Sequence, residues 1–391
     1  MKMNDLLHRF LRKVYTLLFL HQWKEIIMPI DPGRINKILI IRNDNIGDVV
    51  CTTPFIENLR KAFPKAFLSI LVCRLTEDVV QGNPDLDHVY VYDKSKHGRY
   101  QSVWVAWWKQ YQVLQEIRRE QFDLVLGVRL VFTVSQAWMA FYSRAKWRIG
   151  RIPGPKEKKF AFFYTHFIPV PDHPKHEIER TLDFLEPLDV KKGPARLFFP
   201  LTSEAEDHVS HFLEEKGLQE KHPLIGIHLT SRPEVGKTWA DDRYADLLRT
   251  LKNRGDFDVV FSYGPDQTET AQRILQALNF PQPHFLSSDL KKFAAYARAL
   301  DLLVTVDGGP MHIGAALGTP MVALFGKADL LEWAPWGEGH LVLGKGNACD
   351  NISVEDVLAA LELQLERSKK NIRIQNPGVR SQNEAKTQNR I

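Results

Sequence analysis

Short apolar runs that alternate with helical stretches constrain the fold of this chain most strongly. The first two runs are Lys37–Ile41 and Phe67–Val72, and residues 88–92 and 122–126 continue the series. Runs this short, bounded by turn residues, are typical of strands buried on both faces of a parallel sheet. Because helical patterns separate the runs, the series predicts a doubly wound parallel sheet.

The same pattern starts again at Pro223–His228, and runs at 257–261, 302–306 and 321–325 follow it. We therefore predict an α/β protein made of two Rossmann-like, doubly wound parallel-sheet domains that face a cleft, where ligands meet the carboxyl ends of the strands. The expected parts are an N-terminal extension (1–34), two domains (35–200 and 201–366) and a disordered basic tail (367–391).

The basic groups of the chain gather at its two ends. The 391 residues carry a formal net charge of +5. Residues 1–34 hold about +3 and residues 367–391 about +6, so the body between them is close to −4. An acidic body argues against nucleic acid as a partner. The three cysteines form no C-x-x-C pair, which argues against a disulfide framework or a thiolate metal site.

The N-terminal extension has the pattern of a basic amphipathic helix. Between Leu6 and Leu18 the apolar side chains fall within an arc of about 140°, and Arg9, Arg12 and Lys13 lie opposite them. This pattern favours contact with an anionic membrane surface, and packing against the protein body is the alternative. No apolar run approaches the roughly 20 residues of a spanning helix. We therefore expect a cytoplasmic protein at the inner face of the cytoplasmic membrane, and a basic tail that is solubilising rather than a second lipid contact.

The loop from Asp307 to His312 is the strongest candidate site. Its sequence is D-G-G-P-M-H, between a predicted strand and a predicted helix. Gly308 and Gly309 allow the backbone to approach a ligand closely, and Pro310 suits a first helical turn. A helix N-terminus favours a phosphate, with Asp307 placed for sugar hydroxyls and His312 for a phosphate or hydroxyl. The alternative is an ordinary strand-to-helix turn capped by Asp307.

A second candidate loop follows the strand predicted at 223–228. Thr230 and Ser231 offer hydroxyl groups near the strand end, and Lys237 supplies a mobile cation. The Gly-Lys-Thr at 236–238 resembles the end of a P-loop, but Ser231 stands where that motif requires Gly, so a nucleotide triphosphatase is disfavoured. A solvated surface lysine is the alternative for Lys237.

A third candidate is Asp48, which follows the first predicted strand. It could act as a general base, and the alternative is a helix N-cap with no further role. In the same half, Arg144, Arg148 and Arg151 belong to a basic stretch expected to bind a phosphorylated glycan or a lipid head group, with a solvated loop as the alternative. Two D-x-D sequences, at 85–87 and 256–258, lie in a turn context and at a strand start. We interpret both as incidental and expect no metal.

Together these loops resemble glycosyltransferase family 9, the lipopolysaccharide heptosyltransferase family. The resemblance runs from about Lys37 to Arg367. Its carriers are Ile46-Gly-Asp-Val-Val50, His176-Glu-Ile-Glu-Arg180, the loop 230–239, and above all the long run from Asp307 to Gly326.

The resemblance implies a GT-B fold and an inverting, metal-independent transfer of a sugar from a nucleotide diphosphate donor, without a cofactor. A heptose moved from ADP-heptose onto a lipopolysaccharide-core or related glycan acceptor fits it best, which makes a glycolipid the acceptor partner. Asp48 matches the catalytic aspartate of the family, and Lys237 is expected to bind the diphosphate and assist catalysis. The remaining donor-binding positions implied are Thr230, Ser231, Asp307, Gly308, Gly309, Pro310, Met311 and His312.

One position departs from the family pattern. The family commonly places Glu in the loop after the second strand of this half, where it holds the ribose. Here Gln267 stands at the expected register and Glu269 follows two residues later. We assign the ribose to Glu269 and keep Gln267 as the alternative. A nucleotide-sugar 2-epimerase of the same fold and a non-catalytic sugar-binding relative are the competing functions.

Overall fold

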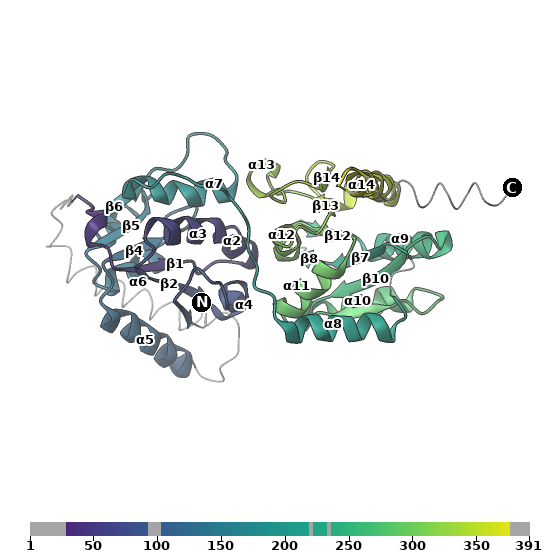
Figure 1. Ribbon diagram of the computed structural model, residues 1–391, viewed down its shortest axis with the longest axis horizontal. Coiled ribbons are helices and arrows are strands. Elements are labelled where there is room, and N and C mark those ends of the chain that lie inside the picture. The colour runs from purple at the N-terminus through teal and green to yellow at the C-terminus, as the bar shows by residue number, and fades with distance from the viewer. Residues whose placement is uncertain (1–28, 93–102, 219–221, 233–235, 376–391) are drawn as a thin grey trace. The chain divides into compact units, whose positions relative to one another are not determined.

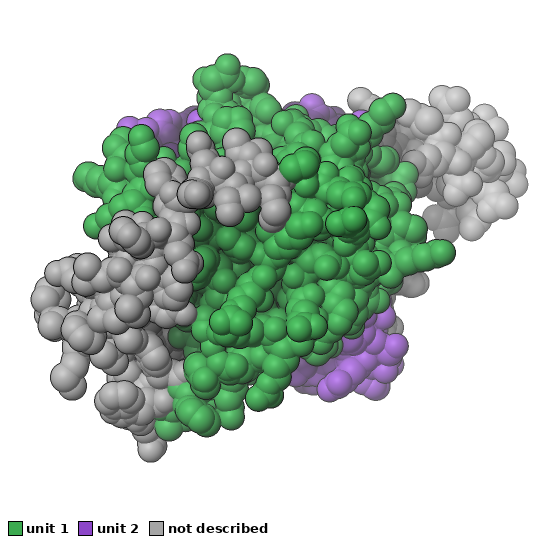
Figure 2. Space-filling view, turned by 90° about the vertical axis from the view of Figure 1, so that its left-hand side faces the viewer, with its two compact units in different colours: residues 1–200 green, residues 201–391 purple. Residues whose placement is uncertain are grey.

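The computed structural model describes residues 29–92, 103–218, 222–232 and 236–375 (Figure 1). The chain divides into two compact units, Met1–Pro200 and Leu201–Ile391, which Figure 2 colours separately. The predicted amphipathic helix near the N-terminus lies outside the described residues. None of the helices in the described part combines the length and apolar character that a bilayer crossing requires.

Unit 1 is built on one six-stranded sheet in which every pair of neighbours is parallel. Its spatial order is β3-β2-β1-β4-β5-β6, and residues 38–41 of the central strand are fully buried. This order is that of a doubly wound dinucleotide-binding sheet. The strands are β1 (Lys37–Ile41), β2 (Phe67–Cys73), β3 (His88–Tyr92), β4 (Leu124–Gly127), β5 (Trp147–Arg151) and β6 (His166–Ile168).

Helices connect the parallel strands of unit 1. The α-helices are α2 (Ile46–Val50), α3 (Thr53–Ala62), α4 (Glu77–Val80), α5 (Val103–Glu120), α6 (Val134–Tyr142) and α7 (Glu177–Leu182). Shorter 3-10 segments are η2 (Pro32–Arg34), η3 (Arg74–Thr76), η5 (Lys158–Phe163) and η6 (Asp183–Leu188). Helix α7 starts at a reciprocal cap, because the His176 side chain accepts from the Ile178 N–H while Glu179 accepts from the His176 N–H.

Unit 2 repeats the arrangement with a second parallel six-stranded sheet, in the order β11-β10-β7-β12-β13-β14. Its strands are β7 (Leu224–Leu229), β10 (Asp258–Tyr263), β11 (His284–Leu286), β12 (Leu302–Val306), β13 (Met321–Phe325) and β14 (His340–Gly344), and a separate antiparallel pair is formed by β8 (Ser231–Arg232) and β9 (Lys237–Thr238). The prediction of two doubly wound parallel sheets is therefore confirmed.

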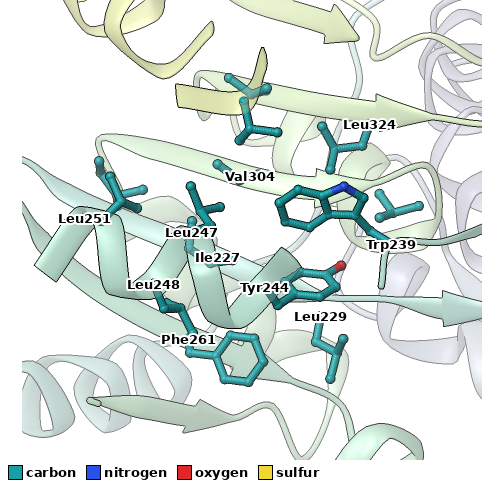
Figure 3. Close-up of a cluster of buried hydrophobic side chains, with 14 of the residues drawn as sticks. Ile227, Leu229, Trp239, Tyr244, Leu247, Leu248, Leu251, Phe261, Val304 and Leu324 are labelled. Carbon is teal, nitrogen blue, oxygen red and sulfur yellow. The ribbon is translucent and has the colours of Figure 1, made fainter. Parts of the chain in front are cut away.

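The helices of unit 2 cover its sheet, with α8 and α11 on one side and α14 on the other in Figure 1. They are α8 (Ser203–Glu215), α9 (Asp241–Arg254), α10 (Thr268–Gln276), α11 (Leu290–Ala299), α12 (Gly309–Ala316), α13 (Leu330–Trp333) and α14 (Val354–Gln375), with 3-10 segments η8 (Pro265–Gln267) and η9 (Cys349–Asn351). Figure 3 shows the core under α9, where Trp239 and Tyr244 pack edge to face with ring centroids 4.9 Å apart.

The disordered tail was expected to begin at residue 367, but the helix before it is longer than expected. Helix α14 continues to Gln375, so residues 367–375, which we expected to be disordered, are helical. Its earlier turns are anchored by the buried Leu361 and Leu365.

Each sheet has one point at which the strand order reverses. In unit 1 it lies between β1 and β4, and in unit 2 between β7 and β12. Ligands of such sheets bind beyond the carboxyl ends of the strands at this switch point. A ligand-binding site is therefore expected at the loops after these four strands.

A buried histidine in unit 2 predicts a pH-dependent stability. His228 on β7 shares a 3.0 Å hydrogen bond between Nδ1 and Ser262 Oγ, and its ring packs against Phe293. Burial lowers the pKa of His228 from 6.5 to about 4, although the charge of Asp266 acts in the opposite direction. Below pH 6.5 the unfolded chain therefore binds a proton that the folded chain does not, and stability falls as the pH falls. We expect His228 to account for about 2 kcal/mol of lost unfolding free energy between pH 7.5 and 5.

Urea unfolding of His228→Gln at these two pH values measures that contribution, since the variant should lose about 2 kcal/mol less than the parent protein. His208→Gln is the control, because His208 is exposed on α8. An identical pH dependence in His228→Gln and the parent protein would contradict the expectation.

Candidate active site

The hairpin after β7 carries the first group of candidate residues. Strands β8 and β9 pair antiparallel, with Ser231 opposite Thr238 and Arg232 opposite Lys237. The chain then enters the core at Trp239, whose indole N–H donates to Ile352 O at 2.9 Å. This anchor fixes the base of the hairpin, so Lys237 is presented from a structured element.

The loop after β12 lies beside this hairpin. The main-chain N–H of Asp307 donates to Leu324 O at 2.9 Å, and its carboxylate is almost fully buried. Asp307 Oδ2 pairs with Lys237 Nζ at 2.6 Å, while the lysine side chain keeps 26% of its surface exposed. The two loops flanking the switch point of unit 2 are thus joined by an ion pair whose cation remains accessible.

A hydroxyl and a helix N-terminus complete this part of the site. A Cβ placed on Gly308 would lie 3.7 Å from Thr230 Cγ2, so the two loops are in near contact there. Thr230 Oγ1 is buried and has no hydrogen-bond partner within the described part of the chain. Helix α12 begins at Gly309 with Pro310 in its first turn, and Gly308 provides no side-chain cap. The main-chain N–H groups at the N-terminus of α12 and the Thr230 hydroxyl are hydrogen-bond donors that suit a phosphate.

The side chains of Met311 and His312 on α12 expose almost no surface to a ligand. His312 is 2% exposed and meets the Trp333 ring with centroids 6.0 Å apart. Met311 is fully buried. Any contact from Met311 to a ligand must therefore come from its main chain.

The ribose candidates lie in the loop after β10, next to β7. Gln267 is the N-cap of α10 and donates from Nε2 to Asp266 Oδ2 at 3.2 Å. Glu269 is exposed in the first turn of the same helix. The assignment of the ribose to Glu269 stays a prediction.

Gly326, directly after β13, sets the position of the Lys237 hairpin. A Cβ at Gly326 would lie 2.6 Å from Gly236 O and 2.9 Å from Cys349 N, and both are main-chain atoms. Main chain cannot rotate away as a side chain can, so Gly326→Ala must push the hairpin off the sheet edge. We expect affinity for ADP to fall by at least 10-fold, with about 1–3 kcal/mol of lost stability. Isothermal titration with ADP and thermal unfolding measure the two effects.

Gly344→Ala is the matched control at the end of the neighbouring strand. A Cβ there would meet only Leu330 Cδ1 at 3.8 Å and Phe325 Cβ at 3.9 Å, which are ordinary contacts. Unchanged ADP affinity in Gly326→Ala would show that the close contact does not position Lys237.

In unit 1, Asp48 lies in the first turn of α2, immediately after the β1 loop. Its side chain is 17% exposed. Arg42 Nη2 donates to Asp48 Oδ1 at 3.1 Å, and Asn45 Nδ2 donates to Oδ2 at 3.2 Å. The candidate base is therefore oriented by one charged and one neutral donor, at the carboxyl edge of the sheet.

Arg42 is the centre of a buried ion-pair network. Its guanidinium is fully buried and pairs with Glu177 at 2.6 Å, in addition to Asp48. Burial lowers the pKa of Arg42, but the charges of Glu177, Asp48 and Asp44 outweigh that effect, so the net shift is upward. Arg42 is thus charged at any pH at which the protein is folded.

Sequence reasoning missed Arg42 and assigned no role to Glu177. The five-residue motif from His176 to Arg180 was noted only as part of the resemblance. The structure explains it, since Glu177 pairs with Arg42 and also accepts from Arg180 Nε at 3.1 Å. The sequence held one signal for this network: an arginine directly after a buried strand, together with a distant Glu-x-x-Arg pair.

The three arginines expected to bind the acceptor are not brought together. Arg144 is exposed and precedes β5, so it lies at the amino edge of the sheet, opposite the edge that carries Asp48. Arg148 donates to Phe163 O at 2.8 Å and Ala145 O at 2.6 Å, and burial lowers the pKa of Arg148 to about 10.

Arg151 is the most deeply buried of these arginines. It donates to Pro169 O at 2.7 Å and Arg180 O at 2.6 Å, and it lies 3.7 Å from Asp183. These contacts fix the end of β5 to the segments of the same unit that carry Pro169, Arg180 and Asp183. Acceptor binding by the three arginines stays a prediction.

The two D-x-D sequences have structural partners. Asp87 accepts from Leu68 N–H at 2.7 Å and from Arg60 at 2.6 Å, and Asp256 pairs with Arg254 at 3.3 Å. Among the described residues, no group of three or more His, Cys, Asp or Glu side chains could hold a metal ion.

Comparisons with known proteins show the family and the fold of this chain. Residues 110–358 match the family model of glycosyltransferase family 9 (heptosyltransferase). Lipopolysaccharide heptosyltransferase 3 of Escherichia coli K12 is 25% identical over 307 residues, covering 77% of this chain and 86% of that protein. The glycosyl transferase family 9 structure from Veillonella parvula is 26% identical and superposes with a TM-score of 0.76, covering 87% of this chain and 99% of that one.

The E. coli ADP-heptose lps heptosyltransferase II shares the fold, with a TM-score of 0.67 at 19% identity, covering 85% of this chain and 99% of that one. Two doubly wound units whose relatives are heptosyltransferases define a GT-B glycosyltransferase. The chain belongs to glycosyltransferase family 9, the heptosyltransferase family. The epimerase and the non-catalytic relative are thereby set aside.

Proposed function

We propose that this enzyme transfers a heptose from ADP-heptose onto a lipopolysaccharide-core or related glycan acceptor. The observation that carries the proposal is the edge of unit 2, where Lys237, the Thr230 hydroxyl and the α12 N-terminus surround the switch point. A nucleotide diphosphate fits this edge because it offers two phosphates to a cation and main-chain N–H groups. Two relatives, lipopolysaccharide heptosyltransferase 3 and the ADP-heptose lps heptosyltransferase II, suggest the two substrates.

Asp48 is the general base in this proposal. Its carboxylate accepts the proton of the acceptor hydroxyl while that oxygen attacks the anomeric carbon of the donor. The bond from the anomeric carbon to the diphosphate breaks on the opposite side, and ADP leaves with the electron pair. One displacement of this kind inverts the anomeric configuration.

Unit 2 stabilises the leaving group. Lys237 and the N-terminus of α12 meet the negative charge that develops on the departing diphosphate, with His312 as a further donor. Thr230, Ser231 and main-chain N–H groups of residues 308–311 hold the phosphates, and Asp307 and Glu269 hold sugar hydroxyls. Because Lys237 supplies the positive charge, no metal ion is required.

The test compares ADP-heptose alone with ADP-heptose plus lipopolysaccharide purified from core-truncated strains. We expect ADP release and a heptosylated product only with the acceptor, an inverted anomeric linkage by NMR, and an unchanged rate in EDTA. An altered sugar formed from the donor alone, or a retained configuration, would overturn the proposal.

We also propose that the protein works at the inner face of the cytoplasmic membrane, held by its basic N-terminal segment. The support is the two-faced pattern between Leu6 and Leu18. Co-sedimentation with anionic vesicles, but not with neutral ones, is the expected result. Equal sedimentation after deletion of residues 1–28 would contradict the role of this segment.

A further inference from the structure

The two terminal nitrogens of the Arg42 guanidinium are both fixed by hydrogen bonds. Nη1 donates to Val128 O at 2.9 Å, and Nη2 donates to Glu177 Oε1 at 2.6 Å and to Asp48 Oδ1 at 3.1 Å. The side chain is fully buried. Three elements, the segment after β4, helix α2 and the start of α7, therefore converge on one cation.

The two carboxylates that share Arg42 Nη2 differ in access to solvent. The Glu177 side chain is 1% exposed, whereas that of Asp48 is 17% exposed. Only Asp48 can therefore meet a substrate hydroxyl. Glu177, with the shorter bond to Arg42, is placed to hold the guanidinium rather than to take part in proton transfer.

The charges around this pair are balanced. The acidic groups are Asp44, Asp48, Glu177 and Asp183, and the basic groups are Arg42, Arg129, Arg151 and Arg180. Arg129 pairs with Asp44, Arg180 with Glu177, and Arg151 with Asp183. The buried Cys51 thiol also faces them, and burial raises the pKa of Cys51 well above its usual range, so it stays neutral. Glu177 thus offsets part of the Arg42 charge that Asp48 experiences.

We propose that Arg42 is a positioning residue for Asp48, and that Glu177 both orients Arg42 and limits how strongly its charge acts on the base. The inference rests on the proposed role of Asp48. Arg42 fixes Oδ1 through a charged hydrogen bond, which leaves Oδ2, bound to the exposed Asn45 amide, as the oxygen that receives the proton. A base oriented in this way does not have to change rotamer before it accepts the proton.

Two variants act on the network in opposite directions. Glu177→Gln keeps the shape but removes the opposing charge, so Arg42 stabilises the ionised form of Asp48 more strongly. The acidic limb of the kcat/KM profile should then move to lower pH by about 1 unit. The double variant Arg42→Met with Glu177→Gln removes the nearer positive charge, and the same limb should move to higher pH by a similar amount.

Both variants should lower kcat by at least 10-fold, and ADP affinity by isothermal titration should stay within twofold, because the donor residues are in unit 2. Glu120→Gln is the control, since Glu120 pairs with Lys37 at the same 2.6 Å distance at the amino edge of the same sheet. It should leave kcat and the pH profile unchanged. If the double variant does not fold, Glu177→Gln alone decides the question through the direction of its shift.

An unchanged acidic limb in Glu177→Gln, or a shift to higher pH, would overturn the inference. A fall in kcat without any shift would also overturn it, because simple structural damage predicts that result. Failure of the proposed function is distinguishable, since the parent protein would then form no heptosylated product. If only the role of Asp48 as the base fails, Asp48→Asn would retain normal turnover whatever the Arg42 and Glu177 variants do.

Discussion

Asp48→Asn is expected to lower turnover by about 100-fold or more while leaving the affinity for ADP unchanged. The amide keeps the size of the side chain, and its oxygen can still accept from Arg42, but its nitrogen cannot accept from Asn45 or take the proton of an acceptor hydroxyl. ADP binding should be unaffected because its proposed ligands belong to unit 2. Single-turnover transfer rates and isothermal titration with ADP separate the two quantities.

Glu57→Gln serves as the control, because Glu57 lies on α3 outside the Arg42 network and pairs with Lys61. Its turnover should match that of the parent protein. Near-normal transfer by Asp48→Asn would remove Asp48 from its role as the base.

Lys237→Met is expected to lower kcat by about 100- to 1,000-fold and also to weaken ADP binding. Lys237 Nζ is the accessible half of the 2.6 Å pair with the buried Asp307, so a diphosphate can approach it from solvent. Its charge acts on the bound diphosphate, and more strongly on the charge that develops as ADP departs. The larger loss should therefore appear in kcat rather than in the dissociation constant.

Lys345→Met is the matched control, because Lys345 also forms a 2.6 Å ion pair in unit 2, with Asp356, but at an exposed position. Lys345→Met should change neither kcat nor the dissociation constant of ADP. A Lys237→Met enzyme that loses ADP affinity but keeps its kcat would assign this lysine to binding alone.

The sequence predicted the central strands well because their burial is recorded directly as apolar runs. β1, β7, β12 and β13 are buried along almost their whole length, and each appears at the expected place. The site loops of unit 2 followed from these strands, because parallel strands bring their carboxyl ends to one edge.

Strands β5, β6 and β11 were not predicted because they are mixed in character or short. β5 has the sequence Trp-Arg-Ile-Gly-Arg, and its arginines are stabilised by main-chain carbonyls from other segments. β6 and β11 are only three residues long. Such strands are specified by their neighbours rather than by a local apolar pattern.

The Arg42 network was beyond the reach of a local pattern for the same reason. Arg42 and Glu177 are separated by 135 positions, and only the fold brings them within 2.6 Å. Arg151, in contrast, looked like a free cation in sequence but is almost fully buried. Whether a charged residue is buried depends on partners that are remote in the chain.

Each unit completes its own sheet on its own side of the junction between Pro200 and Leu201. A substitution that alters strand pairing in one sheet therefore leaves the pairing within the other sheet unchanged. Such independence offers a physical route by which one ancestral scaffold could diversify into many linkages on bacterial cell surfaces.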